Sequence, residues 1–161
     1  MDTANAADLF QRHHLALFRY VYRLTGRRDI AEDVVQDVFL RVVRGLNGYQ
    51  TIGREAAWLF TIARRLLIDR HRGLDRRPSA VDDSAYMSVP ARQEASTALA
   101  EALALVPEVE CDAFLLREVG GLSYDEIALV CQTTPDSVRS RIYRARVRLK
   151  ALLSPTAQVT S

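Results

Sequence analysis

The sequence has few residues that interrupt helices. Only 7 glycines and 5 prolines occur among its 161 residues, whereas alanine, leucine and arginine are common. Helices favour alanine, leucine and arginine, and strands favour β-branched and aromatic side chains. The composition therefore predicts an all-α protein.

Long apolar runs are also missing. The chain contains no stretch of about 18 or more apolar residues, the length that a transmembrane helix requires. Its first ten residues lack the basic start and the apolar run of a secretory signal. We therefore expect a cytoplasmic protein with no membrane insertion of its own.

Residues that bind metals or act as nucleophiles are sparse. Cys111 and Cys131 lie in separate segments without metal-ligand spacing, and His13, His14 and His71 form no spaced set. The sequence contains no phosphate-binding loop, dinucleotide fingerprint or HExxH motif. We expect two reduced thiols, no catalytic residues, no metal and no cofactor.

The net charge is only +2, but it is distributed unevenly. Residues 101–133 carry one arginine against seven acidic residues, whereas residues 134–161 carry five arginines and Lys150 against Asp136. A basic segment directly after an acidic one is more informative than the total charge. Lys150 is the only lysine among 22 basic residues. Arginine suits bidentate contacts to phosphate and guanine, although GC-rich codon usage gives the same bias.

Residues 75–96 interrupt the helical pattern with two prolines, four serines and charges of both signs. We interpret them as a flexible linker between two small helical modules, residues 1–74 and 97–161. Asp29, with Glu32 three residues later, is the expected cap of the second helix. Apolar spacing predicts helices over about residues 9–25, 29–46, 54–72, 98–105, 109–119, 123–131 and 135–153.

The strongest motif is LSYDEIALVCQTTPDSVRSRIYRARVRLK, residues 122–150. Ser123 and Glu126 form a capping box that begins a short helix. After a tight turn, Thr134 can cap a second helix whose first residue is Pro135. A short helix, a turn and a basic helix together predict a helix-turn-helix.

On the basic helix, an apolar stripe that includes Val138 and Ile142 is predicted to face inward, with serine and arginine side chains facing out. Arginine can bind guanine O6 and N7 in the major groove, and serine can bind several base edges. Other arginines contact phosphates and set the register. The alternative is a solvated basic face on a terminal helix.

Two further helix faces carry unusual side chains. The first is on residues 31–46, AEDVVQDVFLRVVRGL, where an acidic face with exposed Leu40 lies opposite a valine stripe. This face suggests a protein partner with basic residues. The alternative is an ordinary solvated face. On residues 54–72, Trp58 alternates with arginines, as in single-strand binders. A lone tryptophan on a helix is also a common core residue. The preceding loop, Gly48–Gly53, could hold an unstacked base.

These motifs, in this order, resemble the extracytoplasmic-function (ECF) group of the sigma-70 family, over about residues 8–153. AEDVVQDVFLRV resembles region 2.2, which binds the β′ coiled coil of RNA polymerase. WLFTIARRLLIDRHR resembles regions 2.3 and 2.4, which open and read the minus-10 element. GLSYDEIA with SVRSRIYRARVRL resembles region 4.2, which reads the minus-35 element.

The resemblance implies three sets of site residues. Those expected at the minus-35 element are Ser137, Arg139, Ser140, Arg141, Tyr143, Arg144 and Arg148. Those expected beside the minus-10 strand are Tyr49, Trp58, Thr61, Arg64, Arg65 and Arg72. Those expected to meet core polymerase are Asp33, Gln36, Asp37 and Leu40.

The implied function is that of a sigma factor that directs core polymerase to promoters and adds no catalysis of its own. Its implied partners are core polymerase (β′ coiled coil and β flap), promoter DNA and an anti-sigma factor. Two positions depart from the family pattern: Arg65 stands where asparagine is frequent, and Asp136-Ser137 stand where Gly-Thr is frequent. The promoter sequence therefore cannot be taken from relatives.

Two other functions are open to the same sequence. A DNA-binding regulator that never enters polymerase would have a similar second half, but it needs neither the acidic face with Leu40 nor the helix with Trp58. A helical enzyme would need converging polar groups, which the sequence does not indicate.

Overall fold

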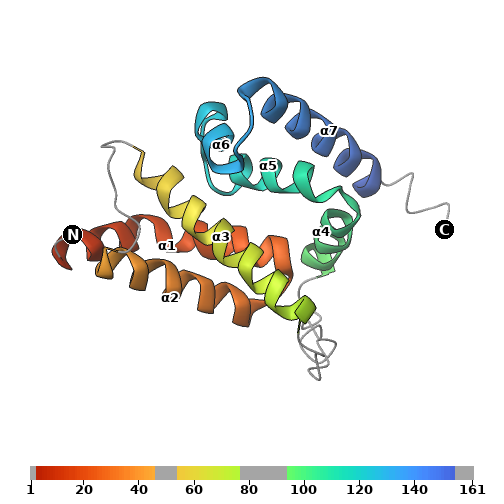
Figure 1. The fold of residues 1–161 in the computed structure, drawn as a ribbon. Coiled ribbons are helices and arrows are strands. Elements are labelled where there is room, and N and C mark those ends of the chain that lie inside the picture. The colour runs from red at the N-terminus through yellow and green to blue at the C-terminus, as the bar shows by residue number, and fades with distance from the viewer. Residues whose placement is uncertain (1–2, 46–53, 77–93, 155–161) are drawn as a thin grey trace.

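The structure is a computed structural model, and it describes residues 3–45, 54–76 and 94–154. Regular structure in these ranges is entirely helical (Figure 1). The all-α prediction is therefore confirmed. The helices are α1 (Thr3–Thr25), α2 (Arg28–Arg44), α3 (Glu55–Arg76), α4 (Glu94–Leu105), α5 (Glu108–Glu118), α6 (Tyr124–Cys131) and α7 (Pro135–Leu153).

The helix ends of the second half follow the predicted capping signals. The Ser123 side chain accepts from the backbone N–H of Glu126, and the Glu126 side chain accepts from that of Ser123, which completes the capping box. Thr134 accepts from the backbone N–H of Ser137 at 3.1 Å and caps α7, with Pro135 as its first residue. Both helices of the motif, α6 and α7, thus begin at a side-chain cap.

The predicted cap of α2 is wrong. Asp29 lies inside the first turn, and the cap position is Arg27, whose side chain makes no capping hydrogen bond. The Asp29 carboxylate instead binds the Arg27 guanidinium at 2.8 Å, so its charge stabilises the positive end of the helix dipole from within the helix. Gly45, with φ 67°, ends α2 in the left-handed conformation, one residue before the predicted end.

The two helices that flank the predicted linker are longer than expected. Helix α3 continues four residues beyond its predicted end at Arg72, to Arg76, and α4 begins at Glu94 where a start at residue 98 was predicted. The predicted base-binding loop, Gly48–Gly53 with Tyr49, lies outside the described residues.

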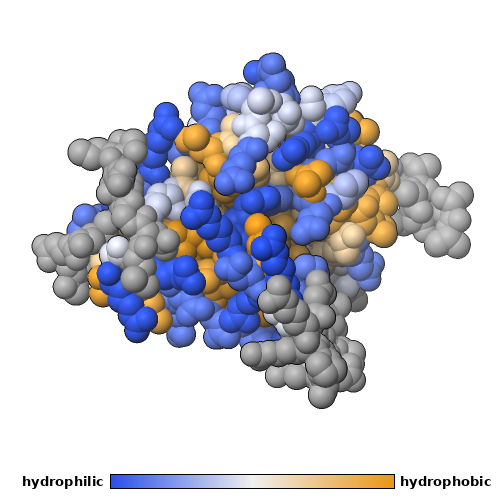
Figure 2. Space-filling model, viewed as in Figure 1, coloured by the Kyte–Doolittle hydropathy of each residue, from blue (hydrophilic) through white to orange (hydrophobic). Residues whose placement is uncertain are grey.

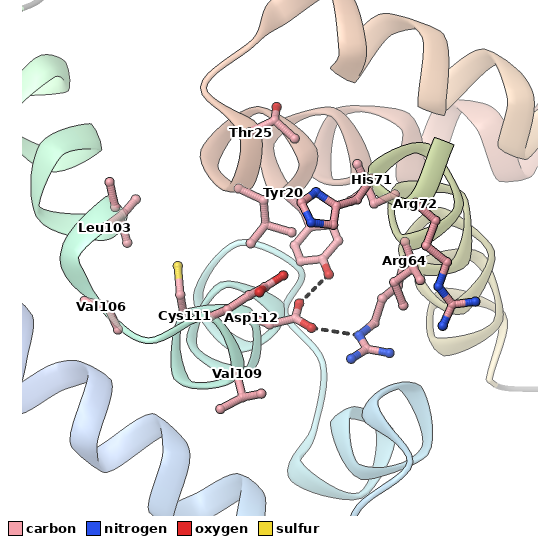
Figure 3. A pocket seen from close by; sticks show the side chains of 15 residues that line it. Tyr20, Thr25, Arg64, His71, Arg72, Leu103, Val106, Val109, Cys111 and Asp112 are labelled. Carbon is pink, nitrogen blue, oxygen red and sulfur yellow. Dashed lines mark hydrogen bonds and ion pairs between the residues drawn. The ribbon is translucent and has the colours of Figure 1, made fainter. Parts of the chain in front are cut away.

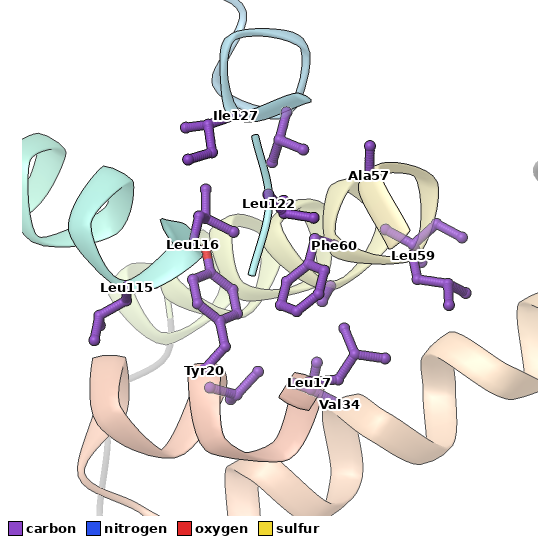
Figure 4. Packing of buried hydrophobic residues seen from close by; sticks show 14 of the residues in the cluster. Leu17, Tyr20, Val34, Ala57, Leu59, Phe60, Leu115, Leu116, Leu122 and Ile127 are labelled. Atoms are coloured by element: carbon purple, nitrogen blue, oxygen red, sulfur yellow. The ribbon is translucent and has the colours of Figure 1, made fainter. Parts of the chain in front are cut away.

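The two halves, α1–α3 and α4–α7, pack against one another. Helix α3 contacts α6, and α1 contacts α4 and α5, so that buried residues of both halves form one hydrophobic cluster. At the junction, fully buried Tyr20 and Phe60 meet edge to face at 5.3 Å, beneath Leu116 and Leu122 (Figure 4). The sequence predicts the two modules but gives no sign of this contact.

Candidate functional site

Helices α6 and α7 form the predicted helix-turn-helix. The inner stripe of α7 is buried, and it consists of Val138, Ile142, Ala145 and Leu149. This burial leaves the opposite face of α7 exposed on the outside of the second half (Figure 1). Tyr143 on that face is 68% exposed, so its ring and hydroxyl are open to a ligand.

Four of the predicted minus-35 residues have few contacts that would hold them inward. Ser140 and Tyr143 are exposed, and Arg141 is half-buried. Arg139 is also exposed; it makes a loose ion pair with Asp136 at 3.7 Å and lies over the Tyr124 ring at 5.8 Å. Exposed pairs of this kind contribute little, so the guanidinium remains available to a ligand.

The other three predicted minus-35 residues are already hydrogen-bonded within the protein. The Ser137 hydroxyl accepts from that of Thr134 at 3.0 Å, within the cap of α7. Arg144 and Arg148 each donate through Nε to buried Glu110 of α5, and both distances are 2.9 Å. Glu110 was not predicted as a site residue, because nothing in the local sequence distinguishes it from the other acidic residues of its segment.

The four residues predicted to bind polymerase lie on α2, and their side chains are exposed or half-buried. Gln36 and Leu40 are exposed, and Asp37 is half-buried. Asp33 makes an exposed ion pair with Arg70 of α3 at 3.2 Å. Val43, one turn beyond Leu40, is also 51% exposed. The exposed face of α2 therefore combines carboxylates with an apolar strip. Val43 was not predicted to belong to it, because the other valines of this helix form the buried stripe.

The predicted minus-10 residues of α3 divide into two groups. Arg65 and Arg72 are exposed, whereas Trp58 is half-buried and packs against the core. The Thr61 hydroxyl donates to the carbonyl of Ala57 at 2.7 Å, within its own helix. The alternation of tryptophan and arginine therefore does not form one open surface in this conformation.

Arg64, the sixth predicted minus-10 residue, points toward the second half. Its Nε donates to Asp112 of α5 at 2.8 Å, and the buried Tyr20 hydroxyl donates to the same carboxylate (Figure 3). Asp112 therefore joins α1, α3 and α5. Burial, with Asp112 beside it, raises the pKa of Tyr20 well above its usual value, so the hydroxyl keeps its proton and remains a donor.

Both cysteines are reduced in the structure. Burial raises the pKa of the Cys111 and Cys131 thiols to about 11, and the Asp112 charge acts in the same direction. A thiol with such a pKa is almost entirely protonated at neutral pH, and the thiolate is the form that attacks substrates or binds metals. Neither cysteine has the chemistry of a nucleophile.

An open pocket of about 780 Å³ lies beside Asp112, between the two halves (Figure 3). Its walls include the apolar side chains Leu67, Ile68 and Leu103, and two of its charged groups, Arg64 and Asp112, are paired with each other. Among the described residues, no group of three His, Cys, Asp or Glu side chains is placed to hold a metal ion. In the same ranges no helix is long and apolar enough to span a bilayer.

The surface distribution is consistent with several separate contact sites. On the face shown in Figure 2, hydrophilic residues cover much of both halves and hydrophobic residues form small patches between them. Helices α2 and α7 lie on opposite sides of the molecule (Figure 1). Their exposed faces can therefore meet two different partners.

Comparison with known proteins identifies the family. Residues 9–77 match the family model for sigma-70 region 2, and residues 96–149 match that for sigma-70 region 4. The chain is 33% identical, over 144 residues, to the ECF RNA polymerase sigma factor EcfG of Rhodopseudomonas palustris, and this match covers 86% of the chain and 79% of the relative. The chain belongs to the ECF sigma factors of the sigma-70 family.

Two other proteins support the same assignment. This sigma factor is 32% identical over 166 residues to SigE of Mycolicibacterium smegmatis; the match covers 96% of the chain but only 63% of that longer relative. Among solved structures, it is similar to the sigma factor RpoE of Bartonella quintana, which was determined in complex with the anti-sigma factor NepR. That likeness has a TM-score of 0.72 at 26% identity and covers 91% of this chain and 94% of the other.

Proposed function

We propose that this sigma factor reads the minus-35 element with the exposed face of α7. The observation that carries the proposal is the exposure of Tyr143 and Arg139 on a helix whose opposite stripe is buried and whose N-terminus is capped. A capped basic helix that follows a tight turn can enter the major groove, where arginine and serine recognise base edges. The residues that we assign to this contact are Ser137, Arg139, Ser140, Arg141, Tyr143, Arg144 and Arg148.

We assign the minus-10 contact to α3 and to the loop before it, with Tyr49, Trp58, Thr61, Arg64, Arg65 and Arg72. The exposed guanidiniums of Arg65 and Arg72 suit a single-strand backbone. Arg64 joins them only when it leaves Asp112. We propose that Arg64 is released when the first half, α1–α3, moves away from the second half, α4–α7, which carries Asp112.

The distance between the promoter elements requires the same movement. Elements about 25 base pairs apart are separated by about 85 Å along B-DNA, at ~3.4 Å per base pair. A compact chain of this length has a radius of gyration of about 15 Å. The packed form therefore cannot reach both elements, and we propose that the segment between α3 and α4 acts as the tether between the separated halves. Each half then raises the effective concentration of the other at the promoter.

We assign the exposed face of α2, with Asp33, Gln36, Asp37 and Leu40, to the β′ coiled coil of core polymerase, and we expect the second half to meet the β flap. Carboxylates around an apolar strip suit a basic partner with a hydrophobic contact at its centre. Catalysis remains with the polymerase, in the cytoplasm. Because the related RpoE was solved with an anti-sigma factor, we also propose an anti-sigma partner for this chain.

Run-off transcription tests the proposal. Core polymerase is supplied with and without this protein on a library of promoter fragments. We expect initiation from a discrete subset of fragments, only when the protein is present. If core polymerase stays inactive while the protein still shifts duplex DNA, the sigma role is wrong and the chain is a DNA-binding regulator.

A pull-down of core polymerase tests the α2 face separately. Asp37→Arg reverses the charge beside Leu40 and should weaken polymerase capture. Glu101→Arg makes the same change of charge on α4, at an exposed position, and should leave capture intact. Equal capture by both variants would show that polymerase binds elsewhere.

A further inference from the structure

Helix α5 carries two buried carboxylates, Glu110 and Asp112, which are the only buried charged residues in the described parts of the chain. Asp112 joins the two halves. Glu110 has a different role, because its two oxygens accept from Arg144 and Arg148 of α7. A buried carboxylate is costly unless it is paired, so these two contacts are what makes its burial tolerable.

The hydrogen bonds to Glu110 use only one nitrogen of each guanidinium group. Each arginine donates through Nε, one to Oε1 and the other to Oε2, so one carboxylate holds two guanidinium groups side by side. The Nη atoms, with four N–H donors per side chain, are not used in these bonds. The Glu110 side chain is 8% exposed, whereas those of Arg144 and Arg148 are 52% and 50% exposed. The carboxylate therefore lies beneath the two guanidiniums and leaves their Nη atoms at the surface.

The two arginines lie at the edge of the outward face of α7. At about 100° per residue, Ser140 is at the centre of that face, opposite the buried stripe. Tyr143 lies on one side of Ser140, and Arg144 followed by Arg148 lies on the other side. Residues at the centre of a recognition helix meet base edges, and residues on its flank meet the phosphates that border the groove. Two arginines one turn apart also repel each other, and the Glu110 charge between them offsets this repulsion.

We propose that Glu110 is a positioning residue that holds Arg144 and Arg148 as a paired clamp for the phosphate backbone at the minus-35 duplex. This inference rests on the proposed function of α7. Glu110 does not touch DNA itself. It reduces the rotamer freedom that two long side chains lose on binding, which is a gain through preorganisation.

The direction in which Glu110→Gln changes DNA affinity distinguishes a positioning role from a simple effect of charge. Glu110→Gln removes a negative charge near DNA, and charge alone would tighten binding. Loss of the held geometry should weaken it. With holoenzyme on the promoter duplex found by run-off transcription, we expect Glu110→Gln to weaken binding about tenfold, the scale expected for two released side chains.

Glu118→Gln is the matched control. Glu118 lies on the same helix and pairs with Arg146 on the other flank of α7 at 2.6 Å, with both side chains about half exposed. The substitution makes the same change in charge and also frees one arginine of α7. We expect binding equal to that of the wild type or slightly tighter. If Glu110→Gln behaves in the same way as Glu118→Gln, the proposal is overturned.

A double-mutant cycle shows whether Glu110 acts through the two arginines. In an Arg144→Ala/Arg148→Ala background, adding Glu110→Gln should cause no further weakening. Further weakening there would mean that Glu110 acts through the fold, which contradicts the proposal. If Glu110→Gln does not fold, Glu110→Asp retains the charge but withdraws the carboxylate by one methylene. It should weaken binding, whereas Glu118→Asp should not, and equal binding by the two variants would count against the clamp.

Failure of the proposed function has a different signature. A wild-type protein that forms no holoenzyme, or that initiates from no promoter, would contradict the sigma role before any Glu110 variant is compared. A wild-type holoenzyme that initiates normally, with Glu110→Gln binding as tightly as Glu118→Gln, would contradict only the clamp.

Discussion

The Tyr20 hydroxyl donates a hydrogen bond to the carboxylate of Asp112, 92 positions later in the chain. Tyr20 is fully buried in α1 and Asp112 belongs to α5, so this bond joins the two halves. Tyr20→Phe removes the hydroxyl and keeps the ring packed against Phe60. A hydrogen bond to a charged group contributes about 1.5–3 kcal/mol, and we expect the free energy of unfolding in urea to fall by that amount.

Tyr22→Phe is the control for this substitution. Tyr22 is two residues away on α1, half-buried, and its ring stacks on Phe18. Removing its hydroxyl should change the unfolding free energy by less than about 0.5 kcal/mol, the range of surface substitutions. Equal losses in the two variants would mean that the Tyr20–Asp112 bond stabilises the fold no more than the hydroxyl of the half-buried Tyr22 does.

Asp112→Ala should cost more than Tyr20→Phe, because it removes the acceptor of three donors at once, the third being the Cys131 thiol at 3.9 Å. The Tyr20 hydroxyl would be left buried without its acceptor, and Arg64 would lose its ion pair. We expect a loss of about 3 kcal/mol in unfolding free energy. The two halves should then separate more easily, and calorimetry should show two transitions in place of one.

An exposed ion pair on the same helix provides the comparison. Glu118→Ala breaks the Glu118–Arg146 pair, which also crosses from α5 to another helix but is about half exposed. Exposed pairs contribute about 0.2–1 kcal/mol, so this variant should remain close to the wild type with a single transition. A similar loss of unfolding free energy in Asp112→Ala and Glu118→Ala would show that the burial of Asp112 does not increase its contribution to stability.

The local part of this fold could be predicted from the sequence. Capping residues and apolar periodicity act over a few positions, which is why Ser123, Thr134 and the stripe of α7 were correctly placed. The cap predicted at Asp29 was wrong for an equally local reason. A carboxylate three residues before a glutamate fits a capping box, but it also fits the first turn of a helix, and the neighbouring Arg27 favours the second arrangement.

The contacts between distant residues could not be predicted in this way. Glu110 and Asp112 lie in an acidic segment, where carboxylates are usually solvated, and nothing in the local sequence identifies Arg64, Arg144 or Arg148 as their partners. These pairs depend on how α5 packs against α1, α3 and α7. Periodicity identifies the buried face of each helix but not the helix that will cover it.

Gln132 provides a prediction on the turn of the helix-turn-helix. It ends α6 with φ 55°, the only positive φ at a non-glycine position in the described ranges. A side chain is disfavoured there, whereas glycine adopts this conformation without steric cost. Gln132→Gly should therefore raise the unfolding free energy by about 0.5–1 kcal/mol and the Tm by about 1–4 °C. Gln132→Ala retains the strain, so the prediction fails if alanine stabilises as much as glycine.

Alkaline pH should destabilise this sigma factor through its buried thiols. The pKa of Cys111 and Cys131 is about 11 in the folded protein, against 9.0 for an unperturbed thiol. Below pH 9 both states hold the protons, and the thiols contribute no pH dependence. Between pH 9 and about 11 the unfolded chain releases protons that the folded chain retains, so the unfolding free energy falls as the pH rises. Tyr20, whose pKa is raised by burial, acts in the same direction above pH 10.

The test is a series of urea midpoints between pH 7 and 10.5, for the wild type and for a Cys111→Ala/Cys131→Ala variant. The variant loses packing and should have a lower midpoint at pH 7. Its midpoint should nevertheless fall less steeply above pH 9, because only the wild type has two thiols that must ionise after unfolding. Parallel curves would mean that these thiols ionise equally well in both states, which their burial beside Asp112 argues against.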